Sequence, residues 1–231
     1  MGQVVLTGDP EIEITLRRSA RARRLSLRVS RLDGRVTMSL PKWTGKGEAL
    51  AFAREKEVWI RRNLSVQVDV VVPEIGGKVL FQGQYVPVVA SRKGRTALFE
   101  DGRILVPGEP DRALVKISAF FKLMARQHLA QASDRYAKML GKPVSRLTLR
   151  DTRSRWGSCT SDGNLMYSWR LIMAPSEVLN YVAAHEVSHL VEMNHSPAYW
   201  AVVSSIYPDY NRPRKWLRDH GQKLHAYRFT N

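Results

Sequence analysis

Two histidines and a glutamate lie within one short segment, His185-Glu186-Val187-Ser188-His189. Residues four apart on an α-helix lie on the same face about one turn apart, so both imidazoles could reach a single metal ion. Glu186 lies roughly a quarter turn away, where its carboxylate could contact a water on that ion without binding the ion itself. The spacing therefore predicts a metal site with two imidazole ligands and a general base.

The residues around this segment predict a helix from Pro175 to Val191. Leu179, Ala183, Val187 and Leu190 are spaced by threes and fours and form one apolar stripe. The two histidines project on nearly the opposite side from this stripe. This placement favours metal ligands over histidines of an ordinary core.

The chain after Val191 is expected to turn at Met193-Asn194-His195 and to begin a new helix at Ser196-Pro197. Serine is a preferred N-cap residue and proline suits the first helical position. A chain reversal here could bring His195 back as a third ligand. Glu192 is a rival ligand, since it falls on the same helical face as His185 and His189, and it could equally accept a hydrogen bond from an imidazole N–H.

The composition is that of a globular protein with a substantial core. The 231 residues are 44% hydrophobic, enough for one large or two small domains. We expect no membrane association, because no apolar run reaches membrane-spanning length and the first ten residues lack the features of a signal peptide. The single cysteine, Cys159, cannot form an internal disulfide, which fits a reducing cytoplasm. It is expected to be a small buried residue.

The net charge of +16 is concentrated at the two ends of the chain. Residues 1–62 carry 14 basic and 7 acidic side chains, and residues 111–231 carry 18 and 9. The densest group is Arg17, Arg18, Arg21, Arg23 and Arg24. Such a cluster would attract phosphate, nucleic acid or another polyanion, although a solvated basic face is the commoner meaning, and the sequence does not choose between them.

Alternation and turn residues predict that residues 1–110 form a β-rich region. Leu25 to Leu40 is expected to be a hairpin with its turn at Asp33-Gly34, followed by one helix over residues 46–64. Further strands are expected at 79–81, 86–90, 97–99 and 104–106, between glycine turns. Gly108-Glu109-Pro110 is the expected boundary, with the two halves packed together.

Residues 111–231 are expected to form the second region. Its apolar periodicity predicts a helix of about thirty residues that ends near Gly141, followed by strands at 147–150 and 164–170. These strands enclose Arg153 to Cys159, which could be a well-packed turn or could line the metal site. The predicted class is α+β, in which the β-rich half is packed on a half with a long helix, a small antiparallel sheet and the His-Glu-x-x-His helix.

A set of short motifs resembles the YgjP-like metallopeptidase-domain family. The motifs are Arg155-Trp156-Gly157-Ser158-Cys159, Gly163-Asn164-Leu165, Trp169-Arg170-Leu171-Ile172, Ala174-Pro175, the histidine segment with Leu190, Met193-Asn194-His195-Ser196, Trp200 and Pro208-Asp209-Tyr210. Proteins of that family look like small zincins, distantly similar to SprT-type proteases. The resemblance implies that His185, His189 and His195 bind the metal and that Glu186 is the catalytic acid/base. Val187-Ser188 departs slightly from the pattern expected there and leaves every implied ligand in place.

The implied chemistry is zinc-dependent hydrolysis of peptide bonds, with one ion per chain and manganese, cobalt or nickel as alternatives. Arg155, Tyr199, Tyr207 and His220 are the candidates for stabilising charge in the transition state. The exposed edge of a strand at Asn164 to Arg170 is the expected place for an extended substrate, by analogy with zincins. Two other functions stay open, a metal-dependent nucleotide pyrophosphatase and a basic nucleic-acid-binding protein with a structural metal site.

Overall fold

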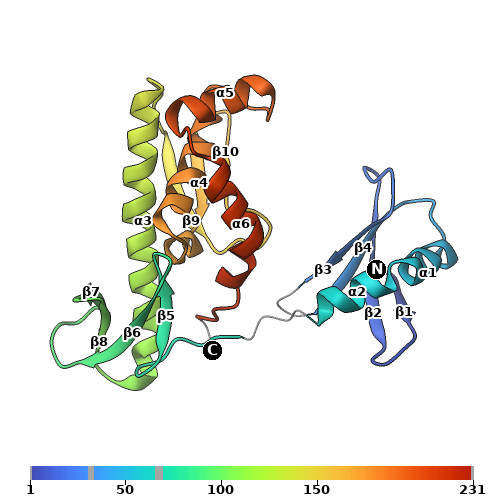
Figure 1. Cartoon of the computed structure of the whole chain (residues 1–231), viewed down its shortest axis with the longest axis horizontal. Coiled ribbons are helices and arrows are strands. Elements are labelled where there is room, and N and C mark those ends of the chain that lie inside the picture. Colours follow the sequence, from blue (N-terminus) through green and yellow to red (C-terminus); the bar gives the residue numbers. More distant parts are fainter. Residues whose placement is uncertain (1, 31–33, 66–69, 230–231) are drawn as a thin grey trace. The chain divides into compact units, whose positions relative to one another are not determined.

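The computed structural model of the chain describes residues 2–30, 34–65 and 70–229. The chain divides into two compact units, unit 1 (Met1–Val70) and unit 2 (Val71–Asn231), which are described separately (Figure 1). The whole is an α+β protein, as the sequence predicts.

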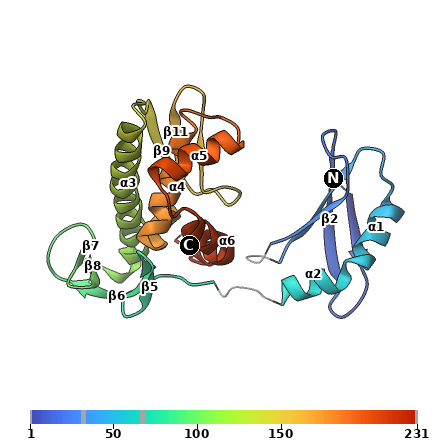
Figure 2. The same ribbon diagram turned by 45° about the horizontal axis from the view of Figure 1, so that its top comes forward.

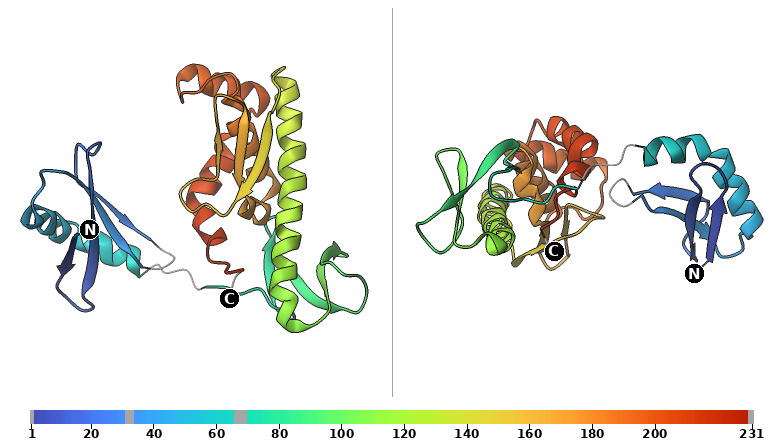
Figure 3. Two further views of the ribbon diagram at one scale, coloured as in Figure 1. Left: turned by 180° about the vertical axis from the view of Figure 1, so that it is seen from behind. Right: turned by 90° about the horizontal axis from the view of Figure 1, so that it is seen from below.

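Unit 1 is a four-stranded sheet covered on one face by two short helices (Figure 3, right panel). The strand order is β1-β2-β4-β3, with β2 and β4 parallel and the outer strands antiparallel to their neighbours. The elements are β1 (Gly2–Leu6), β2 (Ile12–Ser19), β3 (Ser26–Val29), β4 (Val36–Pro41), α1 (Lys46–Glu55) and α2 (Glu57–Leu64). Alternate residues of the strands are buried against the helices, as the period of two in the sequence indicates.

Two details of unit 1 bear on the sequence predictions. The predicted hairpin is confirmed, because β3 and β4 are antiparallel neighbours. Gly34 has a φ of 65° and its N–H bonds the Ser30 carbonyl, while Asp33 of the expected turn lies outside the described residues. The expected single helix over 46–64 is wrong in one respect: it breaks at Lys56, whose ψ of 10° departs from helical geometry and separates α1 from α2.

Unit 2 begins with a second four-stranded sheet of order β5-β6-β8-β7. Its strands are β5 (Lys78–Phe81), β6 (Gln84–Ser91), β7 (Leu98–Glu100) and β8 (Arg103–Pro107). The expected division near residue 110 therefore falls inside unit 2. The reason is the shared core: side chains such as Phe81 and Ile104 belong to the same apolar cluster as Phe121 of the long helix that follows, so residues 71–110 fold with the second half.

The long helix is α3 (Ala113–Met139), which follows a short 3₁₀ turn, η1 (Pro110–Arg112). It ends just before Gly141, which has a φ of 62° and lets the chain leave in a left-handed turn. Its apolar face is buried along most of its length, which confirms the predicted stripe. A three-stranded sheet lies alongside α3 (Figure 3, left panel).

This sheet has the order β10-β11-β9 and is made of β9 (Arg146–Arg150), β10 (Gly157–Cys159) and β11 (Asn164–Ser168). It is mixed, because β11 runs parallel to β9 and antiparallel to β10, so the expected purely antiparallel sheet is wrong. The expected strand over 164–170 stops at Ser168 and continues as a 3₁₀ helix, η2 (Trp169–Met173). Because β11 is central and hydrogen-bonded on both sides, it cannot be the free edge; β10 is an outer strand.

Three helices complete unit 2: α4 (Ser176–Ser188), α5 (Pro197–Ile206) and α6 (Asn211–Leu224). Helix α4 lies between α3 and α6 (Figure 2) and contacts both. Over the described ranges, no helix combines the length and the apolar character needed to cross a membrane.

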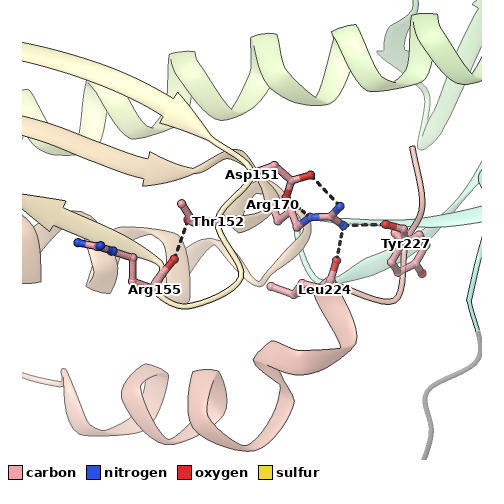
Figure 4. A network of polar contacts seen from close by, with 6 residues as sticks. All are labelled: Asp151, Thr152, Arg155, Arg170, Leu224 and Tyr227. Carbon is pink, nitrogen blue, oxygen red and sulfur yellow. Dashed lines mark hydrogen bonds and ion pairs between the residues drawn. The ribbon is translucent and has the colours of Figure 1, made fainter. Parts of the chain in front are cut away.

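A buried arginine ties the loop before β10 to the end of the chain (Figure 4). Arg170 of η2 donates to both carboxylate oxygens of Asp151, at 2.6 and 3.0 Å. It also donates to the carbonyls of Leu224 and Tyr227, at 2.9 and 2.7 Å. The guanidinium therefore holds the start of the 151–156 loop against the segment that follows α6.

Replacing Arg170 by methionine is expected to lower the free energy of unfolding by about 2–4 kcal/mol. The substitution keeps most of the side-chain volume but leaves Asp151 and two carbonyls without a donor. Urea denaturation of the variant measures the effect. Arg150→Met is the matched control, since Arg150 is an exposed arginine of β9, and equal losses for the two variants would contradict the assignment.

Candidate metal centre

Helix α4 is a central helix, and most of its side chains are buried. Leu179, Ala183 and Val187 of the predicted apolar stripe are buried, and Leu190 packs against the same core. Tyr181 and Ala184, outside the stripe, are buried as well. The helix is therefore enclosed more completely than its amphipathic pattern indicates, and its histidine side lies in a protected environment.

The chain turns directly after α4, earlier than the predicted end at Val191. Ser188 is the last helical residue, and its hydroxyl bonds the Ala184 carbonyl at 2.8 Å. The predicted start of the next helix is confirmed: Ser196 is the N-cap of α5, where its side chain accepts from the N–H of Tyr199, and Pro197 occupies the first turn. The turn between these helices carries His195.

The structure brings the three predicted histidines together. Ligand atoms of His185, His189 and His195 all lie within 4.8 Å of one another, so the three could hold a metal ion. Nε2 of His195 is 3.1 Å from Nε2 of His185. Within the described part of the chain, no carboxylate joins this group.

A backbone carbonyl orients His189. Nδ1 of His189 lies 2.9 Å from the carbonyl oxygen of Glu192. A carbonyl can only accept, so Nδ1 carries the proton and Nε2 keeps its lone pair free for a ligand. Glu192 thus supports an imidazole through its main chain, whereas the sequence had suggested its carboxylate as a partner or a rival ligand.

Aromatic rings enclose the histidines. Tyr199 of α5 stacks on His189 with ring centroids 4.5 Å apart, and its hydroxyl donates to the His185 carbonyl at 2.9 Å. Tyr181 and Trp200 each lie 5.8 Å from the His185 ring. These rings restrict the imidazole orientations and exclude water from one side of the cluster.

The surroundings of His185 and His189 favour the neutral form of both imidazoles. Burial, followed by the neighbouring His189, His195 and Arg214, lowers the pKa of His185 to about 3. Burial also lowers the pKa of His189, partly offset by its hydrogen bond to the Glu192 carbonyl. A neutral imidazole offers the lone pair that a metal ligand needs.

Glu186 is buried beside the outer strand β10. The residue is 6% exposed, and burial raises the pKa of its carboxyl to about 8, against the positive charge of Arg155, which lowers it. A Cβ atom built on Gly157 would lie 2.5 Å from both Cγ and Oε1 of Glu186. The missing side chain at Gly157 is therefore what lets the carboxylate lie against the strand. The Arg153–Cys159 segment lines the site, and it is also a packed turn, because Trp156 stacks on His225 at 4.8 Å.

The four candidates for stabilising charge in the transition state differ in their exposure and in their hydrogen-bond partners. Arg155 is exposed and close enough to Glu186 for its charge to act on that carboxyl. The hydroxyls of Tyr199 and Tyr207 are engaged with backbone carbonyls, those of His185 and Glu177 respectively. His220 is exposed on α6, beside Trp216. Arg155 is the candidate that the geometry favours.

Three contributors were not singled out from the sequence. Tyr181 lies four residues before His185, so helical spacing could have placed it beside that imidazole. Gly157 belongs to the Arg153–Cys159 segment, which was expected to be a packed turn or to line the site, but nothing in the sequence indicated its close approach to Glu186. Arg214 lies over the Trp200 ring at 4.3 Å, and its charge acts on His185. It comes from α6, and only the tertiary fold brings it to the site.

Comparison with known proteins identifies the family of the chain through one of three searches. A search of curated proteins found no match. A solved structure, that of the metallopeptidase zymogen of Pyrococcus abyssi abylysin, shares 18% identity over 42% of this chain and 95% of its own, with a TM-score of 0.37. This similarity is too weak to support a statement about fold or activity. The model of the YgjP-like, metallopeptidase domain matches residues 23–220, which is most of the chain. The chain therefore belongs to the YgjP-like metallopeptidase-domain family, which indicates a metal-dependent hydrolase of the peptidase type.

Proposed function

We propose that the chain is a zinc-dependent peptidase in which His185, His189 and His195 hold the ion and Glu186 is the general base. The observation that carries the proposal is the convergence of three imidazoles, with ligand atoms within 4.8 Å of one another, next to a buried glutamate. Manganese, cobalt or nickel would suit the same ligands, and zinc is the expected ion because imidazole is among its preferred donors.

The residues fit such an ion. Two imidazole nitrogens bound to one tetrahedral zinc ion at 2.0–2.1 Å stand roughly 3.3 Å apart. The corresponding nitrogens of His185 and His195 are 3.1 Å apart. Three protein ligands leave one position open, which is the arrangement of catalytic zinc sites. When bound, the ion would supply positive charge that acidifies water and polarises a carbonyl.

Glu186 is placed to move the protons of the reaction. Its carboxylate accepts a proton from the attacking water and delivers it to the leaving amine, which needs a pKa near the working pH. Burial pushes the pKa of this carboxyl up, whereas Arg155 favours the ionised form that a base requires. Arg155, being exposed, is also positioned to meet the negative charge that develops on the substrate oxygen.

An extended substrate segment is expected to pair with β10. The strand is an outer member of its sheet, and Gly157 places its backbone directly beside Glu186. Main-chain hydrogen bonds would align a peptide across the base without demanding particular side chains. Unstructured protein is therefore the expected substrate class, because folded chains have already paired their backbone groups.

Purified protein, loaded with zinc or stripped by a chelator, should be assayed against casein and against nucleoside triphosphates. The zinc form is expected to cleave casein, and the stripped form to be inactive until zinc is restored. Release of pyrophosphate from a nucleoside triphosphate without proteolysis would contradict the peptidase proposal. Equal cleavage by the stripped and loaded forms would contradict the role of the metal.

Replacing Gly157 by alanine is expected to lower casein hydrolysis about 100-fold. The added methyl group would overlap Glu186, so either the carboxylate or β10 must move by about an ångström. The rate constant of the zinc-loaded variant measures the effect. Ser158→Ala in the same strand is the control, because it removes an atom instead of adding one, and a similar loss in both would argue against a steric cause.

A further inference from the structure

Basic side chains from three separate segments gather at one end of the unit 1 sheet. Because β2 and β4 run parallel, with Arg18 opposite Leu40, both strands finish at the same end, and β3 begins there. The upper end of this unit in Figure 1 therefore carries the β2–β3 and β4–α1 connections together. We call this end the basic end; its exposed cations are Arg17, Arg21, Arg23, Arg24, Lys42 and Lys46.

The six cations of the basic end greatly outnumber the acidic side chains near them, of which Glu48 in the first turn of α1 is one. Between Glu13 and Asp33 the sequence has no acidic residue. Across the described part of the chain, no carboxylate forms an ion pair with any of the six cations. The acidic residues Glu11 and Glu13 lie at the other end of β2. Like charges gathered in this way repel one another, so an anionic partner would relieve the repulsion.

An exposed tryptophan lies among these cations in the sequence. Trp43 is 76% exposed and lies between Lys42 and Thr44 in the β4–α1 connection. Arg18 fixes this connection, because its Nη1 donates to the carbonyls of Lys42 and Thr44, both at 2.7 Å. The indole is thus presented on an anchored loop, where it contributes nothing to the core of unit 1.

The face of the unit 1 sheet that α1 and α2 leave uncovered carries polar side chains next to the basic end. Helices α1 and α2 pack on the opposite face. In register across the sheet, Arg17 lies opposite Ser39, which lies opposite Ser26, and the adjacent row pairs Thr37 with Arg28. Arginine and hydroxyl side chains are among the groups that contact phosphate and sugar in protein–DNA complexes.

We propose that the basic end of unit 1 binds single-stranded nucleic acid, with Trp43 stacking on a base and the surrounding cations contacting phosphates. A cationic surface with an exposed aromatic ring is the combination used for single strands, because unpaired bases offer their faces for stacking. A duplex hides those faces. A membrane-binding surface would need several apolar side chains, and the basic end offers one indole beside hydroxyl-rich strands.

This inference does not rest on the metal centre. The basic end belongs to unit 1, and none of its residues contributes to the histidine cluster of unit 2. Binding is therefore expected to be the same for zinc-loaded and chelator-stripped protein. Failure of the peptidase proposal and failure of nucleic-acid binding can be told apart in one preparation.

The test uses the full chain and a fluorescent oligothymidine of about 20 nucleotides, followed by anisotropy over a range of salt concentrations. Wild-type protein is expected to bind the single strand more tightly than the duplex of the same length. Arg21→Ala with Arg23→Ala should lower affinity at least about tenfold and reduce the log–log salt slope by about 1.4, since each phosphate contact in a single strand contributes about 0.7. Trp43→Ala should lower affinity about tenfold with little change in slope.

Matched control variants show whether binding depends on the basic end or only on the total positive charge of the chain. Arg54→Ala with Arg62→Ala removes two exposed arginines from the helices, and Trp59→Ala removes another exposed tryptophan. Both controls are expected to bind as the wild type does. Absence of binding at low salt, equal losses in the controls, or a preference for the duplex would overturn the proposal. Trp43-dependent binding to phosphatidylserine vesicles that exceeds binding to the oligonucleotide would overturn it as well.

Discussion

Glu186→Gln is expected to lower casein hydrolysis by about 10²- to 10⁴-fold while leaving zinc content unchanged. Glutamine has nearly the same shape as glutamate and fits beside Gly157, so β10 and the histidines should keep their positions. It cannot take a proton from water at neutral pH, so the chemical step loses its base. The measurements are the initial rate of cleavage and the zinc stoichiometry of the same purified sample.

Glu177→Gln provides the matched control for this prediction. Glu177 lies on the same helix, in its exposed first turn, and undergoes the identical change in charge. Its variant should hydrolyse casein at the wild-type rate. If Glu186→Gln also kept that rate, the activity would belong to another protein in the preparation or to a different base. If it lost zinc, the glutamate would be acting on the metal instead of on the proton.

His195→Ala is expected to weaken zinc binding by more than about 100-fold, beyond the 10- to 100-fold typical of losing a supporting partner. The substitution removes one of three imidazoles from an exposed turn, so the core and the two helices it joins stay intact. Competition with a chromophoric chelator gives the dissociation constant. Thermal unfolding of the stripped protein shows whether the fold has changed.

Glu192→Ala is the companion variant. It separates two roles for Glu192: a carboxylate ligand, which the substitution removes, and a backbone acceptor for His189, which it leaves in place. Here the Glu192 backbone carbonyl, which survives the substitution, holds the His189 ring. Zinc affinity is therefore expected to change by less than about threefold, well under the loss of a supporting partner. A larger loss in Glu192→Ala than in His195→Ala would make Glu192 the third ligand.

The local parts of the site could be predicted from the sequence because local chemistry decides them. Helical spacing puts His185 and His189 together, and the Ser196-Pro197 start of α5 creates the turn that carries His195. The long helix and the β3–β4 hairpin follow from strong periodicity and turn residues. These features depend on contacts between residues close in the chain.

The parts that sequence reasoning misjudged depend on contacts between distant residues. Pairing of β11 with β9 is set by the fold of unit 2, so neither the mixed sheet nor the outer position of β10 could be read from alternation. Phe81 and Phe121 share one core, so the two units divide after Val70. Gly108 and Pro110 were expected to mark this boundary, but they lie in a turn within unit 2. Arg214 reaches the site only because α6 packs against α4.

The three-residue length of β10 has a consequence for selectivity. A long unpaired strand edge invites association between copies of a protein, whereas so short an edge offers too few hydrogen bonds to hold a partner alone. If substrates bind as proposed, a peptide that also reached the histidine cluster would be held at two points, and the second attachment would benefit from the high effective concentration created by the first. Under the proposed function, chains that engage only the edge of β10 would therefore dissociate quickly, and peptides that reach both the edge and the histidine cluster would be favoured.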